Sequence, residues 1–309
     1  TLQRIGDSPI SAVDLFCGAG GLTHGLIRAG IKVEAGIDID IQARHAFETN
    51  NPGAVFLDWD LSRKYSPSVE RLFDPGRPYR LLAGCAPCQP FSKLTNGQGR
   101  HRSWDLLVYF ARLVKGIRPE LVTMENVPEL ADRGRMVLDV FLKALESNGY
   151  SYDWDVLDCE RYGVPQRRRR LVLVASRLGD ISLPAPMYGD PGEWKTVRKT
   201  IHALPPLESG GEDPSDRLHV ASRLSEMNLR RIQATPPDGG TQRHWPEELL
   251  PACHRRESGK TYYTIYGRMW WDRPAPTMTT LCTGLGNGRF GHPEQNLSLI
   301  HISEPTRPY

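Results

Sequence analysis

Ala12-Val13-Asp14-Leu15-Phe16-Cys17-Gly18-Ala19-Gly20-Gly21 is the stretch that decides the fold, because a strand-like apolar run leads directly into a glycine-rich loop. Leu22, Leu26 and Ala29 then follow at helical spacing. Glycines in such a loop let backbone amides approach a ligand closely, as in dinucleotide-binding folds. The stretch predicts a strand, a loop and a helix of an open parallel α/β sheet, in which ligands bind at the carboxyl ends of the strands.

An acid follows the next predicted strand, Lys32 to Ile37. This acid, Asp38, lies 20 residues after Gly18, where such folds place a carboxylate on ribose hydroxyls. A glycine-rich turn alone is weak support, and Gly18-x-Gly20-Gly21 lacks the third glycine of the nicotinamide fingerprint. The loop and the acid together favour an adenosine-bearing cofactor.

A third short strand is predicted at Ala54 to Leu57, and Asp60 follows it. The Asp60 carboxylate could accept a hydrogen bond from an adenine amino group. It could also cap the turn that follows, since aspartate is a common capping residue. From this stretch alone the capping role is favoured.

Cys88 is the candidate nucleophile. The apolar run Leu81-Leu82-Ala83-Gly84 predicts a buried strand that Pro87 and Pro90 end, so the thiol is expected on a loop beyond its carboxyl end. Most free cysteines act as small buried hydrophobes. The Cys-x-x-Cys spacing with Cys85 also admits a redox pair or half of a metal site, but no second Cys-x-x-Cys follows in the sequence.

Two more polar groups are expected at the same edge of the sheet. Leu121 to Met124 is typical of a strand, and it delivers Glu125 and Asn126 there, although a lone glutamate at a strand end is more often a solvated turn residue. Gln166-Arg167-Arg168-Arg169-Arg170 precedes the apolar strand Leu171 to Ala175, so alternate arginines should point to opposite faces. By itself this run indicates a solvated basic edge that discourages strand pairing. With a nucleophile and an acid nearby, contact with phosphate or a base is favoured.

Regular alternation of helices and strands ends in the middle of the chain. Helices are predicted at Trp104 to Ile117 and Met136 to Leu145, with a strand at Tyr150 to Leu157. From about Arg177 to about Tyr266, proline, glycine and charged residues become frequent, which predicts a separate small domain.

Basic and ring-bearing residues are mixed within this small domain, as they are on nucleic-acid surfaces. They are His244, Trp245, His254, Arg255 and Arg256, with Cys253 beside them. Because Cys253 and His254 lack partners at zinc-ligand spacing, no metal is expected.

The composition of the chain indicates a globular protein without membrane spans. The chain has 309 residues, of which 39% are hydrophobic and 24% charged, so one large domain and a smaller one can be built. No apolar run approaches the roughly 20 residues of a membrane span, and no signal peptide is recognisable, so we expect a cytoplasmic protein with no membrane partner. Six unevenly spaced cysteines indicate reduced thiols. The net charge of +3 leaves room for a local basic face without proving a polyanionic partner.

Five short motifs occur in an order that is typical of one family. They are Asp14-Leu15-Phe16-x-Gly18-x-Gly20-Gly21, Pro87-Cys88-Gln89, Glu125-Asn126-Val127, Gln166-x-Arg168-x-Arg170 and Arg273-Pro274-x-Pro276-Thr277. In this order and at these separations the chain resembles the bacterial C5-cytosine-specific DNA methyltransferases. Each motif is modest, but five in series leave little room for coincidence.

The resemblance implies a fold and a division into domains. The fold would be the Rossmann-like sheet of S-adenosylmethionine-dependent methyltransferases, with helices on both faces and a small irregular target recognition domain. Residues 1–176 would form the catalytic and cofactor-binding domain, and residues 177–266 the target recognition domain. Residues 267–296 would return to the catalytic domain and fix the domain interface, and residues 297–309 would be a tail foreign to the family.

The resemblance also assigns the site residues. S-adenosyl-L-methionine would be bound by Phe16, Gly18, Gly20, Gly21, Asp38, Ile39, Asp60, Leu61 and Pro87, with Asp38 on the ribose and Asp60 on the adenine. The target cytosine would be surrounded by Cys88, Glu125, Arg168 and Arg170. Further contacts to substrate or DNA would come from Gln89, Ser92, Asn126 and Gln166.

The implied activity is methyl transfer to C5 of a cytosine in double-stranded DNA. Cytosine C5 is a poor nucleophile, so a thiolate must first add to C6 and convert the ring to an enamine. Cys88 would add to C6, Glu125 would bond or protonate N3, Arg170 would hold O2, and Arg168 would position the loop or the substrate. The cytosine must be flipped out of the duplex. We expect a monomer that marks a host recognition site, with a restriction endonuclease acting on the same site as its possible partner.

The family pattern stops after Asn296, so the chain is expected to be truncated before the family's Gly-Asn motif, which leaves its activity open. One alternative is an inactive, truncated DNA-binding fragment. A second is an RNA cytosine-5 methyltransferase of the transfer-RNA type, although the Cys-Phe-Thr signature of that branch is absent from the sequence. A nicotinamide oxidoreductase is a distant further alternative, because the glycine spacing is wrong and Cys88 would have no role.

Overall fold

The computed structural model describes residues 8–63, 66–87, 103–256, 263–279 and 284–298. The chain forms two compact units. The first comprises residues up to Leu157 together with Arg169–Ala185, and the second comprises Asp158–Arg168 and the chain from Pro186 onward. The predicted division into a catalytic domain, a target recognition domain and a return segment stays a prediction about function.

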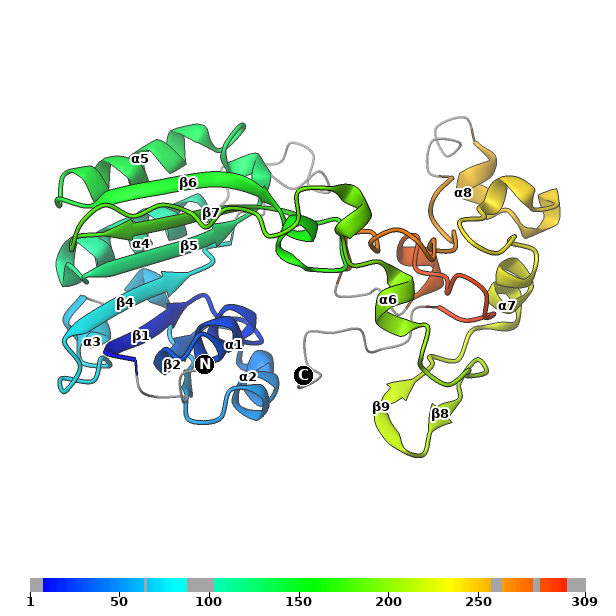
Figure 1. The fold of residues 1–309 in the computed structure, drawn as a ribbon, viewed down its shortest axis with the longest axis horizontal. Coiled ribbons are helices and arrows are strands. Elements are labelled where there is room, and N and C mark those ends of the chain that lie inside the picture. The colour runs from blue at the N-terminus through cyan, green and yellow to red at the C-terminus, as the bar shows by residue number, and fades with distance from the viewer. Residues whose placement is uncertain (1–7, 64–65, 88–102, 257–262, 280–283, 299–309) are drawn as a thin grey trace. The chain divides into compact units, whose positions relative to one another are not determined.

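A seven-stranded sheet forms the centre of the first unit, with the strand order β3-β2-β1-β4-β5-β7-β6 (Figure 1). The strands are β1 (Ile10–Leu15), β2 (Lys32–Ile37), β3 (Val55–Leu57), β4 (Tyr79–Gly84), β5 (Leu121–Asn126), β6 (Ser151–Asp158) and β7 (Arg169–Ser176). Strand β1 pairs in parallel with β2 and β4, and β4 pairs in parallel with β5. Strand β7 departs from the parallel arrangement, because it runs antiparallel to β5.

Helices alternate with the strands of the first unit, and the hydrophobic spacing predicted those at 21–28, 103–117 and 135–146. Those of the first unit are α1 (Gly21–Arg28), α2 (Arg44–Asn50), α3 (Ser66–Glu70), α4 (Ser103–Ile117) and α5 (Arg135–Glu146). The second unit contains the short elements α6 (Val197–Ile201), β8 (Glu212–Asp213), β9 (Asp216–Val220), α7 (Glu226–Gln233) and α8 (Ala252–Arg255). Every strand and helix predicted from the sequence is present, with its ends within two residues of the predicted ends.

Helices cover both faces of the sheet, because successive side chains along its strands belong to two different core clusters. Val13 of β1 and Leu82 of β4 belong to a large core cluster with residues of α4 and α5. Their neighbours Ala12 and Leu81 belong to a second cluster that includes Phe47 of α2. Successive residues of a strand point to opposite faces, so the predicted α/β sheet with helices on both faces is confirmed.

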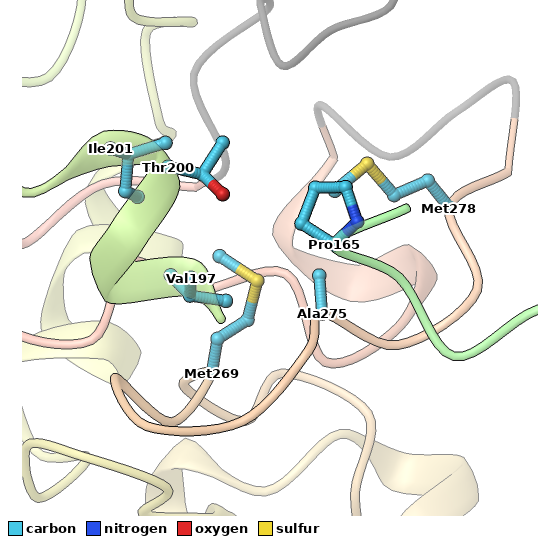
Figure 2. Close-up of a pocket in the computed structure, with 7 residues that line it drawn as sticks. All are labelled: Pro165, Val197, Thr200, Ile201, Met269, Ala275 and Met278. Carbon is cyan, nitrogen blue, oxygen red and sulfur yellow. The ribbon is translucent and has the colours of Figure 1, made fainter. Parts of the chain in front are cut away.

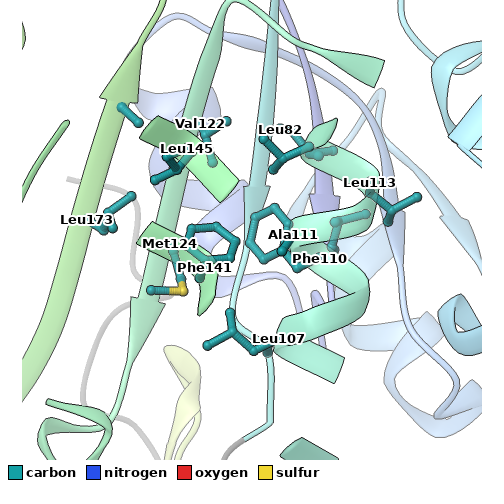
Figure 3. Close-up of a cluster of buried hydrophobic side chains, with 14 of the residues drawn as sticks. Leu82, Leu107, Phe110, Ala111, Leu113, Val122, Met124, Phe141, Leu145 and Leu173 are labelled. Atoms are coloured by element: carbon teal, nitrogen blue, oxygen red, sulfur yellow. The ribbon is translucent and has the colours of Figure 1, made fainter. Parts of the chain in front are cut away.

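The larger core stabilises the edge of the sheet that carries the candidate site. Phe110 of α4 meets Phe141 of α5 edge to face, with ring centroids 5.0 Å apart (Figure 3). Met124, next to Glu125 on β5, is fully buried in the same cluster. Burying one such side chain contributes about 1.5–3 kcal/mol to stability. The strand that presents Glu125 is therefore anchored in the core by the residue next to it.

The second unit has an apolar core of its own, in which α6 packs against the segment from Met269 to Ala275. A small cavity of about 20 Å³ remains in this packing (Figure 2), and it is lined by Pro165, Val197, Thr200, Ile201, Met269, Ala275 and Met278. A void of this size is at the lower limit for one water molecule, so the packing is close to complete.

Arg268 organises the polar interior of the second unit. Its guanidinium is buried and donates to the carbonyls of Ile232, Thr235, His292 and Gln295 and to the side-chain oxygen of Asn296. Burial lowers the pKa of Arg268 to about 10. One side chain thus joins the end of α7 to the segment from His292 to Asn296.

No helix in the described part of the chain is long and apolar enough to span a membrane.

Candidate active site

The antiparallel direction of β7 brings the arginine-rich run to the carboxyl end of β5. In the register of the two strands, Glu125 lies opposite Val172 and Asn126 opposite Leu171. The residues that begin β7 therefore lie where β5 ends. A parallel strand would have carried Arg170 to the other edge of the sheet.

Glu125 is held at both carboxylate oxygens. Nε of Arg170 lies 2.7 Å from Oε1 in an ion pair. The Arg170 side chain is 18% exposed and that of Glu125 is 31% exposed. The Sγ of Cys85, which follows β4 directly, donates to Oε2 at 2.7 Å. Burial and the charge of Glu125 raise the pKa of the Cys85 thiol. Cys85 therefore acts as a neutral donor, and the carboxylate is fixed between a cation and a thiol.

Asn126 anchors the loop that leads to Cys88. Its side chain is 2% exposed, and Nδ2 donates to the carbonyl of Ala86 at 2.9 Å. Its Oδ1 accepts from the backbone amide of Val127 at 2.8 Å. The structure thus uses Asn126 to hold the backbone beside exposed Pro87, whereas a contact of Asn126 with DNA was predicted. The predicted residues Cys88, Gln89 and Ser92 lie outside the described part of the chain.

The glycine loop after β1 is tied to the acid after β2. The backbone amide of Gly18 donates to Oδ2 of Asp38 at 2.8 Å, and the amide of Asp40 donates to Oδ1 at 2.9 Å. Gly18 has a φ of 50°, and no atom lies within 4 Å of the position that a Cβ would take there or at Gly21. The loop therefore leaves open space above two of its glycines.

Gly20 has a different role in the same loop. Its φ is 88°, and a Cβ would lie 2.3 Å from Nδ2 of Asn51 and 2.7 Å from Cδ2 of Phe47. Glycine is required here because α2 packs directly against the backbone. The predicted glycines thus divide into one that permits packing and two that face open space.

The predicted adenosine contacts lie around this loop. Phe16 is half-buried with a φ of 57°, and Ile39 is 70% exposed. Oδ1 of Asp60 accepts from the amide and the hydroxyl of Ser62, which is the capping role that the sequence alone favoured. Leu61 is only 4% exposed and belongs to the larger core, so its side chain is not presented to a ligand.

These residues fit an adenosine-bearing cofactor. An exposed apolar side chain, Ile39, stands next to a carboxylate, Asp38, whose oxygens keep acceptor capacity for hydroxyl groups. The open positions above Gly18 and Gly21 leave room for a ligand at the carboxyl ends of the strands, where α/β sheets bind nucleotides.

A buried acid lies beneath the loop. Asp14 is fully buried in β1; Oδ2 accepts from the Thr23 hydroxyl at 2.7 Å, and Oδ1 has no hydrogen-bond partner among the described residues. Burial raises the pKa of Asp14 to about 7, and the charge of Asp38 adds to this effect. Asp14 lies within the first of the five sequence motifs, but no role was predicted for it.

Arg170 belongs to the first unit, whereas Gln166 and Arg168 belong to the second. Oε1 of Gln166 accepts from the amide of Met278 at 3.0 Å, and the carbonyl of Arg168 accepts from the amide of Cys159 at 2.8 Å. The side chain of Gln166 thus helps to join its own segment to the segment around Met278 within the second unit. Its predicted contact with DNA stays a prediction, as does the contact of Arg168 with cytosine.

The basic and ring-bearing residues expected on a surface at 244–256 are not all exposed. Trp245 is buried, and its Nε1 donates to the hydroxyl of Thr235 at 2.8 Å. Trp245 therefore does not belong to the expected surface, because its indole lies in the core of this unit. Among the described residues no cluster of histidine, cysteine and acidic side chains could hold a metal ion.

Cys85 is the site residue that sequence analysis missed. It was weighed only as half of a Cys-x-x-Cys pair. Its position directly after an apolar strand, next to Ala86 on the loop to Cys88, is a signal that it lies at the same edge as Glu125.

A family model described as "C-5 cytosine-specific DNA methylase" matches residues 10–295. The type II methylase M.HgiDII of Herpetosiphon aurantiacus is 46% identical over 291 residues, which cover 94% of this chain and 81% of that protein. The type II methyltransferase M1.BsuMI of Bacillus subtilis (strain 168) is 30% identical over 298 residues, with 92% and 68% covered.

A solved structure titled as a DNA modification methyltransferase encoded within a prophage (E. coli) shares the fold, with a TM-score of 0.68 at 19% identity. The match covers 94% of this chain and 85% of that one. The order of the motifs, the sheet that brings Glu125 and Arg170 together and the match over most of the sequence agree. The chain belongs to the C-5 cytosine-specific DNA methylase family.

Proposed function

We propose that this chain transfers the methyl group of S-adenosyl-L-methionine to C5 of a flipped cytosine in double-stranded DNA. The observation that carries the proposal is the carboxylate of Glu125, which is clamped by Arg170 and Cys85 at the carboxyl edge of the sheet. A preorganised polar group of this kind can stabilise charge that develops on a ring during reaction. The family assignment identifies that ring as cytosine.

Cys88 would be the nucleophile that adds to C6 of the cytosine. The addition places negative charge on the ring, and Glu125 would bond or protonate N3 to draw that charge away. Arg170 would hold O2 while pairing with Glu125. Asn126 supports these roles by fixing the carbonyl of Ala86, two residues before Cys88. After methyl transfer, solvent water takes the C5 proton, and elimination of the Cys88 thiolate from C6 gives 5-methylcytosine.

S-adenosyl-L-methionine, when bound, supplies the electrophilic methyl group. Asp38 would bind its ribose hydroxyls, and Gly18 and Gly21 would let it approach the backbone closely. Phe16 and Ile39 would supply apolar contacts to the adenine, with Asp60 at its edge. Pro87 and the backbone at Gly20 and Leu61 would complete the site.

Trapping on 5-fluorocytosine tests the nucleophile and the substrate together. The fluorine blocks the final elimination, so a working enzyme stays covalently attached to duplex DNA in the presence of S-adenosyl-L-methionine. We expect a denaturation-resistant band that disappears in Cys88→Ala and persists in Cys253→Ala, a control at an exposed cysteine of the second unit. Two results would overturn the proposal: a band that persists in Cys88→Ala, or the absence of a band when the wild-type protein is incubated with DNA of diverse sequence.

A type II restriction-modification context is also proposed, because M.HgiDII and M1.BsuMI carry type II names. Methylation would then protect one short DNA sequence from a restriction endonuclease that acts on the same site. Sequencing of methylated positions after reaction on random DNA should give a single motif. Methyl transfer to transfer RNA in preference to DNA would instead support the RNA methyltransferase alternative.

A further inference from the structure

A basic pocket of about 480 Å³ lies within the second unit. Its lining includes Arg167, Trp270, Arg273, Thr277, Thr279 and Arg289. No acidic residue is among the described residues that line it. Three arginines thus line one pocket, and none of its described lining residues carries a carboxylate.

Two of the arginines lie over the same tryptophan ring. Cζ of Arg273 is 4.5 Å and Cζ of Arg289 is 4.0 Å from the ring centroid of Trp270. Desolvation lowers the pKa of Arg289; the electrostatic interaction with Tyr263 opposes this shift, and the charge of Arg273 adds to it. The two cations therefore repel one another, and a bound anion would relieve that repulsion.

The acidic residues nearest in sequence are engaged elsewhere. Asp272 pairs with Arg198 at 2.7 Å, and Glu294 accepts from Nε1 of Trp271 at 2.8 Å. Within the described part of the chain, Arg167, Arg273 and Arg289 form no ion pair. The positive charge of the pocket is consequently left for a ligand.

The pocket is built on fixed backbone. The amide of Arg167 donates to the carbonyl of Ala275 at 2.7 Å, and the Thr277 hydroxyl donates back to the Arg167 carbonyl at 2.6 Å. Arg167 and Arg273 are therefore presented from two segments that are bonded together. Nη1 of Arg289 donates to the carbonyls of Gly239 and Arg268, so this side chain too is held in place.

Trp270 is fixed as well. Gly239 has a φ of 96°, and a Cβ there would lie 1.9 Å from Nε1 of Trp270, so the indole packs directly on the glycine backbone. With guanidinium groups over its ring, Trp270 serves to position arginines. This arrangement favours recognition of phosphate over stacking of a base.

We infer that this pocket binds a phosphate group of the DNA backbone, which rests on the proposed function and adds a sequence-independent contact to it. Arginine forks are typical ligands of phosphate oxygens, and the Thr279 hydroxyl can add a further donor, whereas the hydroxyl of Thr277 donates to the Arg167 carbonyl. The phosphate would fix the position of the second unit on the duplex and would contribute nothing to the choice of sequence.

The salt dependence of DNA binding tests the inference. Arg167→Gln and Arg273→Gln each remove an exposed cation, and Arg230→Gln makes the same change at an exposed position of α7. Dissociation constants of a fluorescent duplex are measured from about 50 mM to about 200 mM salt. Combining both pocket substitutions should lower the slope of log affinity against log salt by about 0.9, because the protein then neutralises one phosphate fewer.

Several outcomes separate the possibilities. Weakened binding of all DNA sequences by the pocket variants, with Arg230→Gln behaving as wild type, supports the inference. A wild-type slope in the pocket variants overturns it, and the proposed function survives if the wild-type protein still traps on 5-fluorocytosine. Thermal stabilisation by inorganic phosphate that the variants lose, with an unchanged DNA slope, would assign the pocket to a free anion and also overturn it. A wild-type protein that binds no DNA overturns both proposals.

Discussion

The thiol of Cys85 donates to Oε2 of Glu125 at 2.7 Å, on the carboxylate oxygen opposite to the one that pairs with Arg170. Because its pKa is raised, the thiol stays protonated and adds no second charge beside the glutamate. The contact fixes the orientation of the carboxylate without neutralising it. Cys85 is therefore a positioning residue for the group proposed to act on cytosine.

Removal of this donor should slow methyl transfer. A hydrogen bond to a charged group contributes about 1.5–3 kcal/mol, so Cys85→Ala should lower the single-turnover rate about tenfold or more. Cys85→Ser retains a donor and should recover most of the rate, while the KM for DNA changes little in either variant. Equal rates in the serine and alanine variants would show that the hydrogen bond has no role, and Cys253→Ala controls for loss of a thiol elsewhere.

The elements of the first unit could be predicted because each strand is short, apolar and followed by a polar or glycine-rich turn. The strand Lys32–Ile37 was predicted with its observed ends. The direction of β7 could not be predicted from its own residues, because an apolar strand has the same pattern in either direction. That direction decides that Arg170 meets Glu125, so this pairing came only from the resemblance and the structure.

The parts of the site that sequence did not reveal depend on contacts between distant segments. Asn126 was expected to touch DNA, but its side chain is turned inward to Ala86, 40 positions away in the chain. Trp245 was expected on a nucleic-acid surface because residues near it are basic, yet its indole is buried. Local composition indicates that a residue can bind nucleic acid, and only tertiary packing decides whether it faces outward.

Asn126→Ala should destabilise the protein as well as slow the reaction. The change leaves the carbonyl of Ala86 and the amide of Val127 without their side-chain partner, and a buried unsatisfied group costs about 1–3 kcal/mol. Urea unfolding should therefore show a lower midpoint. Asn50→Ala is the matched control, since its amide bonds Ala46 at an exposed end of α2 and the change should cost less. Equal losses in the two variants would contradict the anchoring role.

Arg268→Lys should destabilise the second unit although it keeps the positive charge. An ammonium has three donors, whereas the guanidinium bonds five oxygen atoms from two separate segments. Loss of two such bonds predicts a decrease of about 3 kcal/mol or more in the free energy of unfolding. Arg230→Lys on the surface of α7 serves as the control. Calorimetry that shows the same melting temperature for both variants would contradict this role.

Asp14→Asn should change the pH dependence of stability in a defined direction. Folding raises the pKa of Asp14 from 3.8 to about 7. Between these values the folded chain holds a proton at Asp14 that the unfolded chain releases, so the contribution of Asp14 to stability falls as pH rises through this window. At 1.36 kcal/mol for each pKa unit, the full change is on the order of 4 kcal/mol.

Asparagine resembles the protonated acid at every pH and removes this dependence. Urea unfolding of both proteins should therefore show the wild type losing stability relative to Asp14→Asn from about pH 4 to about pH 7, with a constant difference above that range. The other carboxylates titrate alike in the two proteins, so the difference isolates Asp14, apart from its coupling to Asp38. A difference that stays constant from about pH 4 to about pH 8 would show that burial does not keep Asp14 protonated beneath the glycine loop.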